Sequence, residues 1–429
     1  MYSPRQKVLW FAFVTRIAVI SLQTISNILL TDHDANVFVS PEDPTLRKSY
    51  GDITIDTLLG GLKRWDAQYY IHISQYGYTY ENCLAFFPLF PLIVRYVAYV
   101  LNSALGSFLN FHSILLVSAT LVNIVVFIKS ADILHILSLR VLKNEAKAYK
   151  AAILYCINPA SIFFTAPYSE TLFAWMSFYT MLKCTENETL RFANIDILSG
   201  LPAGFSIMAR SNGLINLGFI LYTSFKNVVE RTIPEIVCKY RTLKRKLILP
   251  FLLLPLVTSS IALLLTLIIY VLPGSAESSW CNESLPLSYS YIQSHYWDVG
   301  FLNYYKLKQI PNFILASPIL FLMFYHCLFY ISNNLKLCFR LGLKNNILNF
   351  GYTNRMAYRA EYYRGFGTKD PALFVYVIHA MFLTIFCMLY VHIQVSTRLL
   401  ASSSPLLYWI CAFDNMYSTI LFSNFYPWT

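Results

Sequence analysis

Charged residues are scarce in this chain of 429 residues. Asp, Glu, Lys and Arg make up only 13% of it, hydrophobic residues make up 56%, and the mean hydropathy is +0.50. A soluble protein needs a larger charged fraction to cover its surface. The composition therefore excludes a soluble globular protein and predicts an all-α polytopic membrane protein, with residues 1–429 forming a single multi-pass domain.

The sequence also lacks the motifs of nucleotide and metal chemistry. GxxxxGK[ST], GxGxxG and HExxH do not occur, and the nine cysteines form no CxxC pair. The one DxD sequence, Asp32-His33-Asp34, has no supporting context and is expected in a solvated loop. We therefore expect neither a metal nor a cofactor.

Internal repeats and Gly/Ser-rich linkers are missing as well, which disfavours a transporter built from repeats. Aromatic residues, by contrast, are abundant at 17%, with 32 Tyr and 32 Phe. This content suits interfacial belts and apolar cavities that hold a flexible lipid. The net charge of +11 comes from basic residues clustered in loops between apolar segments, so a nucleic-acid partner is not expected.

A helix needs about 20 apolar residues to cross the hydrocarbon core, and by this measure the chain contains about ten spans. The first is longer than the core of a signal peptide and lacks a small-residue cleavage site, so we expect it to be retained. The predicted spans lie near residues 8–30, 84–104, 111–138, 146–158, 160–183, 197–224, 247–272, 310–332, 371–394 and 405–425.

Basic loops predict the orientation of these spans. The loops 225–246 and 333–370 are rich in Lys and Arg and are expected on the cytoplasmic side. Counting spans then makes 31–83 and 273–309 luminal. The glycosylation sequons at Asn187 and Asn282 fall in luminal loops under this count, and a disulfide between Cys83 and Cys281 is one option there.

One basic stretch does not fit this count. It would lie on the luminal side, so either two short segments near 146–183 do not span fully or the charge rule is broken here. The stretch consists of Arg140, Lys143, Lys147 and Lys150.

The stretch 64–91, RWDAQYYIHISQYGYTYENCLAFFPLFP, carries the strongest candidate for chemistry. Asp66 follows Trp65 between two apolar segments, and an acid at a hydrocarbon boundary can act as a base toward a lipid-linked substrate. The alternative is an interfacial aromatic next to a helix-capping acid.

Two polar clusters interrupt later apolar segments. In NPASIFFTAPYSETLFA, residues 158–174, two prolines break the helix near Tyr168 and Glu170. Glu170 either contacts substrate or forms a structural hydrogen bond between the broken helices. In ARSNG, residues 209–213, Arg210 is a candidate ligand for a lipid phosphate, and the alternative is an internal salt bridge, for example to Glu170.

Two further clusters lie in the C-terminal third. The tyrosine-rich stretch 289–313, with Lys308 and Gln309, has the composition of a platform over a cavity, or of ordinary interfacial aromatics. Arg398 lies in 392–409 beside the last predicted span, where the default expectation is that its side chain extends to the interface.

Together these blocks resemble the phosphatidylinositol-glycan class V family, the second mannosyltransferases of GPI-anchor synthesis. The resemblance rests on RWDAQYY, AFFPLFP, NPASIFFTAPYSETLFA, ARSNG, YIQSHYWDVGFLNYYKLKQIPNF, QVSTR and SPLLYW, in family order along nearly the whole chain. It implies a GT-C type enzyme of the endoplasmic reticulum that adds mannose in α-1,6 linkage from dolichyl-phosphate-mannose. Other GT-C sugar transferases, a lipid transporter and a structural subunit stay open as alternatives, as does the need for a small membrane partner subunit.

The resemblance also implies roles for residues. Asp66 falls on the family's catalytic acid, although Gln68-Tyr69 replaces a Glu-His pair and leaves His72 as the nearby substitute. An inverting displacement is implied, with the leaving phosphate stabilised by a cation drawn from Arg210, Lys308 or Arg398. The expected substrate-binding residues are Arg64, Trp65, Tyr168, Glu170, Arg210, Asn212, Lys308, Gln309 and Arg398.

Overall fold

The computed structural model describes residues 2–30, 38–41, 48–189, 200–227, 229, 288–343 and 370–413. Within these ranges the regular secondary structure is entirely helical, which confirms the predicted all-α class. The helices are α1 (Pro4–Leu29), α2 (Tyr50–Leu59), α3 (Asp66–Tyr76), α4 (Leu89–Leu105), α5 (Phe111–Leu142), α6 (Glu145–Cys156), α7 (Glu170–Thr189), α8 (Leu201–Ala209), α9 (Leu217–Asn227), α12 (Ser288–Trp297), α13 (Ile310–Asn333), α14 (Leu335–Phe339), α16 (Phe374–Leu389), α17 (Ile393–Ser403) and α18 (Pro405–Phe413).

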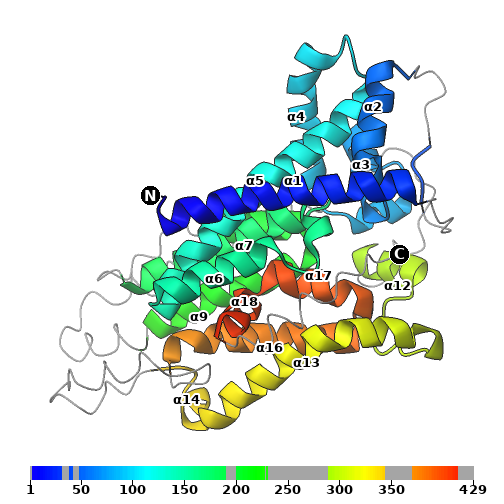
Figure 1. The fold of residues 1–429 in the computed structure, drawn as a ribbon. Coiled ribbons are helices and arrows are strands. Elements are labelled where there is room, and N and C mark those ends of the chain that lie inside the picture. The colour runs from blue at the N-terminus through cyan, green and yellow to red at the C-terminus, as the bar shows by residue number, and fades with distance from the viewer. Residues whose placement is uncertain are drawn as a thin grey trace, which may run out of the picture.

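Helices α1 and α5 run antiparallel and set the long axis of the bundle (Figure 1). Near the start of α1, Arg5 forms an ion pair of 2.6 Å with Asp132 late in α5. At the far end of α1, Thr24 donates a 2.7 Å hydrogen bond to the backbone of α2, and Asp52 of α2 accepts one of 2.9 Å from the N–H of Asn110 just before α5. Helices α2, α3 and α4 therefore gather at the end of the bundle opposite the N-terminus.

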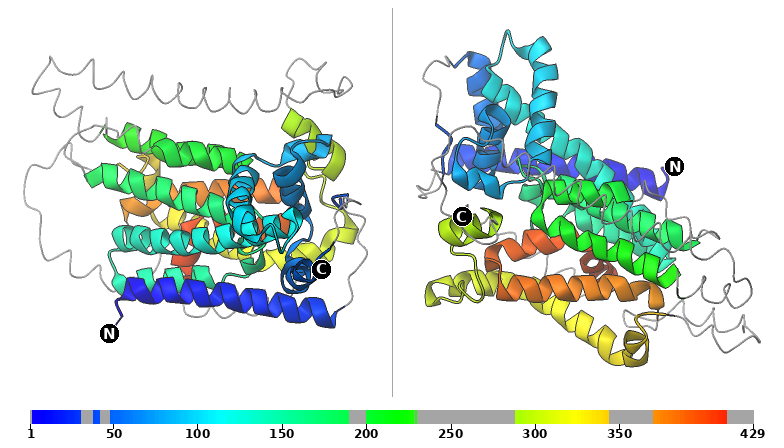
Figure 2. Two further views of the ribbon diagram at one scale, coloured as in Figure 1. Left: turned by 90° about the horizontal axis from the view of Figure 1, so that it is seen from above. Right: turned by 180° about the vertical axis from the view of Figure 1, so that it is seen from behind.

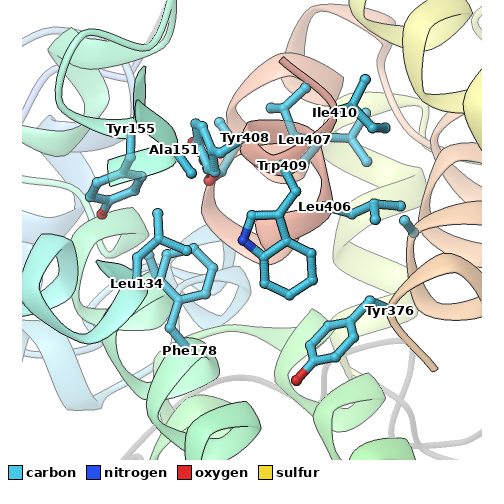
Figure 3. Close-up of a cluster of buried hydrophobic side chains, with 14 of the residues drawn as sticks. Leu134, Ala151, Tyr155, Phe178, Tyr376, Leu406, Leu407, Tyr408, Trp409 and Ile410 are labelled. Carbon is cyan, nitrogen blue, oxygen red and sulfur yellow. Dashed lines mark hydrogen bonds between the residues drawn. The ribbon is translucent and has the colours of Figure 1, made fainter. Parts of the chain in front are cut away.

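The interior of the bundle is filled by aromatic side chains around α18 (Figure 3). Trp409 is fully buried, and its indole N–H donates a 2.7 Å hydrogen bond to the hydroxyl of Ser138 on α5. Its ring meets Tyr376 of α16 edge to face at 4.8 Å, and Tyr408 contacts Tyr155 of α6 in the same way at 5.3 Å. Such pairs combine a large buried apolar area with a preferred geometry.

Four helical segments in the described ranges are long and apolar enough to cross a membrane: Pro4–Leu29, Phe111–Leu142, Leu307–Asn333 and Pro371–Leu389. They confirm a multi-pass membrane protein, but not the expected count of ten. The predicted span 247–272 lies outside the described residues, as does the second half of 405–425. The predicted span 197–224 is divided into α8 and α9 by the 3-10 helix η5 (Ser211–Asn216).

Helix α4 corrects the predicted span at 84–104. It is shorter than that prediction and lies crosswise to α1, beside α2 (Figures 1 and 2). Arg95 holds it in this position by donating to the carbonyls of Ser74 (2.5 Å) and Gln75 (3.0 Å) at the end of α3. Hydropathy identified an apolar helix here but carries no information on its direction.

This correction changes the side on which the basic stretch lies. Arg140 at the end of α5 forms an ion pair of 3.0 Å with Glu186 near the end of α7, and the ammonium of Lys147 lies 3.6 Å from the ring centroid of Phe413. The basic stretch is thus at the same end of the bundle as the start of α1. The count of spans made from the sequence placed the basic stretch on the same side as residues 31–83. That placement is wrong, because the count treated α4 as a span.

Arg16 is a fully buried cation in the middle of α1. Its guanidinium donates to the carbonyls of Cys156 (2.9 Å) and Ser161 (2.8 Å) and to the hydroxyl of Thr165 (2.9 Å), and it lies 3.8 Å from the ring centroid of Phe127. The carbonyl of Cys156 ends α6 and that of Ser161 begins the 3-10 helix η3 (Ser161–Phe164), so both lie where the α-helical hydrogen-bonding pattern is interrupted. Within a membrane such groups must find partners inside the protein, and Arg16 supplies them.

We expect Arg16→Met to destabilise the fold by about 3 kcal/mol, because buried carbonyls lose their donors. Unfolding of the detergent-purified protein, followed by temperature or denaturant, measures this loss. Arg5→Met on the same helix is the matched control. The ion pair of Arg5 with Asp132 is screened by solvent on the arginine side, where 57% of the Arg5 side chain is exposed, so the expected loss is less than about 1 kcal/mol. Equal losses for the two variants would contradict the assigned role of Arg16.

Candidate functional site

Asp66 is the first residue of α3, and an unusual turn places it there. Trp65 has φ 56° and ψ −126°, a conformation that costs a residue with a side chain about 1–3 kcal/mol. The turn is closed by a 3.2 Å hydrogen bond from the N–H of Ala67 to the carbonyl of Arg64, which also accepts one of 2.9 Å from the hydroxyl of Tyr168. Trp65, and not Asp66, occupies the N-cap, so the structure does not support Asp66 as a capping acid.

The carboxylate of Asp66 belongs to a cluster of two acids and two arginines, which we call the acid–arginine cluster. An oxygen of Asp66 lies 2.6 Å from Nη2 of Arg398, and Nη1 of Arg398 lies 3.4 Å from Glu170. Glu170 also forms a close ion pair with Arg210. The cluster is formally neutral, which reduces the cost of burying four charges.

The members of the cluster differ in their exposure. The side chain of Glu170 is completely buried, those of Arg398 and Arg210 are 13% and 17% exposed, and that of Asp66 is 31% exposed. Asp66 is therefore the member most accessible to a substrate.

Arg398 corrects the expectation that its side chain extends to the interface. It projects from α17 toward α3 and α7, and its guanidinium lies 5.1 Å from the ring centroid of Phe163 and 5.5 Å from that of Tyr168. Cation–π contact of this kind adds to the two ion pairs. The side chain is therefore held in the protein interior by rings as well as by charges.

The break in NPASIFFTAPYSETLFA is confirmed, because α6 ends at Cys156 and α7 begins at Glu170. Asn123 of α5, which the sequence did not single out, donates its amide to the carbonyls of Ala166 (2.5 Å) and Tyr168 (3.1 Å). The sequence signal that could have identified Asn123 is a polar amide within an otherwise apolar segment. Its hydrogen bonds fix the backbone immediately before Glu170.

The ARSNG motif turns the chain sharply after α8. A Cβ at Gly213 would lie 2.3 Å from the carbonyl oxygen of Ser206, so only glycine lets η5 pack this closely on α8. Asn212 donates a 3.0 Å hydrogen bond to Ser403 at the end of α17. Arg210, just after α8, is thereby directed at Glu170, which confirms the salt bridge considered as one alternative for this pair.

Six expected substrate-binding residues are not members of the acid–arginine cluster: Arg64, Trp65, Tyr168, Asn212, Lys308 and Gln309. Trp65 forms the turn before Asp66. Lys308 is exposed in the 3-10 helix η8 (Leu307–Gln309), and the side chain of Gln309 accepts hydrogen bonds from Tyr304 (2.7 Å) and Asn312 (2.6 Å). Arg64 is exposed and donates to Asn27 of α1 at 3.2 Å. Tyr168 and Asn212, by contrast, contact the elements that build the cluster.

His72 does not take the place of the histidine expected beside the acid. One ring nitrogen is hydrogen-bonded to the hydroxyl of Ser40 (2.8 Å) and the other to that of Thr79 (2.7 Å). The ring also meets Phe38 edge to face. With both nitrogens engaged in this way, His72 has none left for Asp66.

Several expectations fall on residues that the structure does not describe. Cys83 is fully buried, but its suggested partner Cys281 is outside the described ranges, as are Asn282, Asp32 and Asp34. Asn187 is in the last turns of α7, where its side chain is not described, and the preceding Glu186 pairs with Arg140. The backbone of Asn187 is therefore at the end of the bundle that holds the basic stretch, which corrects the count that placed this sequon on the same side as residues 31–83.

Comparison with known proteins agrees with the resemblance found in the sequence. The family model described as "Mannosyltransferase (PIG-V)" matches residues 5–418. GPI mannosyltransferase 2 of Drosophila melanogaster is 36% identical, covering 99% of this chain and 100% of its own. GPI alpha-1,6-mannosyltransferase 2 of Mus musculus is 36% identical (96% of this chain, 84% of its own), and that of Homo sapiens is 34% identical (95% and 83%).

No solved structure matches the chain. The all-helical membrane architecture and the family together confirm the expected GT-C type of fold. With a family match over nearly the whole length and relatives of similar length, the chain belongs to the PIG-V mannosyltransferase family.

Proposed function

We propose that this protein adds the second mannose of the GPI anchor, in α-1,6 linkage, using dolichyl-phosphate-mannose as donor and the mannosyl-glucosaminyl-phosphatidylinositol intermediate as acceptor. The names of its relatives support the reaction, and the acid–arginine cluster supports the chemistry. The observation that carries the proposal is a partly exposed carboxylate, Asp66, held next to guanidinium groups at one end of a membrane bundle. A base and a phosphate-binding cation are the two groups that such a transfer needs.

The distribution of charge supports a luminal site in the endoplasmic reticulum. Arg140, Lys147 and Lys226 lie at the ends of helices on the side of the bundle opposite Asp66. Under the positive-inside rule that end faces the cytoplasm, so the acid–arginine cluster faces the lumen.

The proposed reaction is a single displacement with inversion. Asp66 accepts the proton of the 6-hydroxyl of the first mannose while that oxygen attacks the anomeric carbon of the donor sugar. The bond from the anomeric carbon to the phosphate oxygen breaks, and the leaving dolichyl phosphate gains a charge. Arg398 and Arg210 are better placed to stabilise this charge than Lys308, which is exposed on η8.

Orientation is the main contribution of the protein in this mechanism. The strained turn at Trp65 fixes the start of α3, and the hydroxyl of Tyr168 holds the same turn from α7. Positioning two lipid-linked substrates beside a carboxylate whose backbone is held in place lowers the barrier.

We expect Asp66→Asn to lower mannose transfer at least about 100-fold, because the amide cannot accept the proton. The variant is expressed in cells that lack the second GPI mannosyltransferase, and surface GPI-anchored protein and the one-mannose lipid precursor are measured. The wild type should restore the surface protein, while the variant should leave the precursor to accumulate. Asp56→Asn, which removes an exposed partner of Lys63 on α2, is the control and should rescue fully. Rescue by Asp66→Asn at equal expression would exclude Asp66 as the base.

A second pair of variants identifies the phosphate ligand. Arg398→Ala should lower the rate of transfer in membranes at least about 100-fold, because a charge next to the leaving group is lost. Lys308→Ala should change it by less than about fivefold, the effect of a solvent-screened charge. The assay measures radiolabelled mannose passed from dolichyl-phosphate-mannose to the acceptor lipid. The reverse order of effects would assign the phosphate to Lys308.

A further inference from the structure

Arg398 contacts both carboxylates of the acid–arginine cluster at once. Nη2 lies 2.6 Å from Oδ2 of Asp66, and Nη1 lies 3.4 Å from Glu170. The guanidinium that would bind the donor phosphate is therefore already occupied by the proposed base. Equally, one oxygen of that base is occupied by a guanidinium N–H and is not open to a sugar hydroxyl.

The two carboxylates differ in their freedom to leave Arg398. Glu170 is completely buried and also holds Arg210, so moving it would strand two cations in the interior. Asp66 is 31% exposed and lies in the first turn of α3. Of the two partners, Asp66 is the one that an incoming anion can displace at low cost.

Arg398 would stay in place during such a displacement. Glu170 retains its ion pair, and the rings of Phe163 and Tyr168 continue to contact the guanidinium. A phosphate that approaches from the exposed side thus meets a cation that is already oriented, with a planar set of donors suited to phosphate oxygens.

We propose that the phosphate of the donor lipid displaces Asp66 from Arg398, so that donor binding itself frees the base for the acceptor hydroxyl. The inference rests on the proposed function. It makes the reaction ordered, with the donor first and the acceptor second, because without the donor the carboxylate remains paired.

The charges and atoms balance through the cycle. The cluster starts neutral, and the phosphodiester of the donor adds one negative charge. During transfer the proton of the acceptor hydroxyl moves to Asp66, the new bond forms between the acceptor oxygen and the anomeric carbon, and the electron pair of the broken bond remains on the phosphate. Loss of that proton and departure of dolichyl phosphate return Asp66 to Arg398.

The test is the affinity of the purified full-length protein for dolichyl phosphate in detergent. If Asp66 competes with phosphate for Arg398, Asp66→Asn should bind dolichyl phosphate at least about tenfold more tightly than the wild type. Asp66→Ser removes the same charge and serves where Asp66→Asn does not fold. Arg398→Gln should lose the binding. Asp132→Asn is the matched control, because its carboxylate also pairs with an arginine, Arg5, but near the other end of the bundle, and its affinity should equal that of the wild type.

Equal or weaker binding by Asp66→Asn, with Asp132→Asn unchanged, would overturn the exchange. The phosphate of the acceptor is distinguished by measuring phosphatidylinositol in parallel. A gain in affinity for phosphatidylinositol alone would assign Arg398 to the acceptor and would also overturn the proposal.

This test is separate from the proposed function. If Asp66→Asn loses transfer but does not bind dolichyl phosphate more tightly, the exchange is excluded and the reaction stands. If Asp66→Asn binds more tightly but the wild type does not rescue cells, the exchange stands and the reaction is excluded.

Discussion

The pairing of Glu170 with two arginines is the interaction on which the site depends. Glu170 is completely buried, and its charge is shared by Arg210 after α8 and Arg398 on α17. Three parts of the chain far apart in sequence are therefore held at one point by a carboxylate that cannot be solvated. Removing one member of such a group leaves the others as uncompensated buried charges. Asp66 lies at the exposed edge of this group and is joined to it by its ion pair with Arg398.

Glu170 reaches this point because the chain is not helical before it. The interruption between α6 and α7 leaves buried backbone carbonyls without α-helical partners, and two polar side chains from other helices satisfy them. Arg16 of α1 donates to Cys156 and Ser161, and Asn123 of α5 donates to the residues immediately before α7. The carbonyls of Cys156, Ser161, Ala166 and Tyr168 thus have partners within the protein, which explains how the irregular segment can hold Glu170 in place.

Much of the site could be predicted because charges are costly among apolar residues. This rule singled out Asp66, Glu170 and Arg210, and the complementary charges of the last two suggested their pairing. It failed for Arg398, since a sequence does not show whether a side chain near a helix end points to the interface or to the interior. Hydropathy likewise identified α4 as a helix but not its crosswise direction, and the error was carried into the count of spans. Lys308 and Gln309 were expected to bind substrate because of the composition of their segment. Composition does not show whether a residue lies near the acid–arginine cluster.

Arg16 also bears on how the protein is made. Helix α1 is synthesised first, yet the groups that bind its guanidinium lie about 140 residues later in the chain. An arginine in the middle of a lone membrane helix costs about 2.5–3.5 kcal/mol on insertion scales. Until α6 and the segment after it emerge from the ribosome, α1 must carry this cost without its partners. The final position of α1, with Arg16 fully bonded, therefore depends on synthesis of the segment that precedes Glu170.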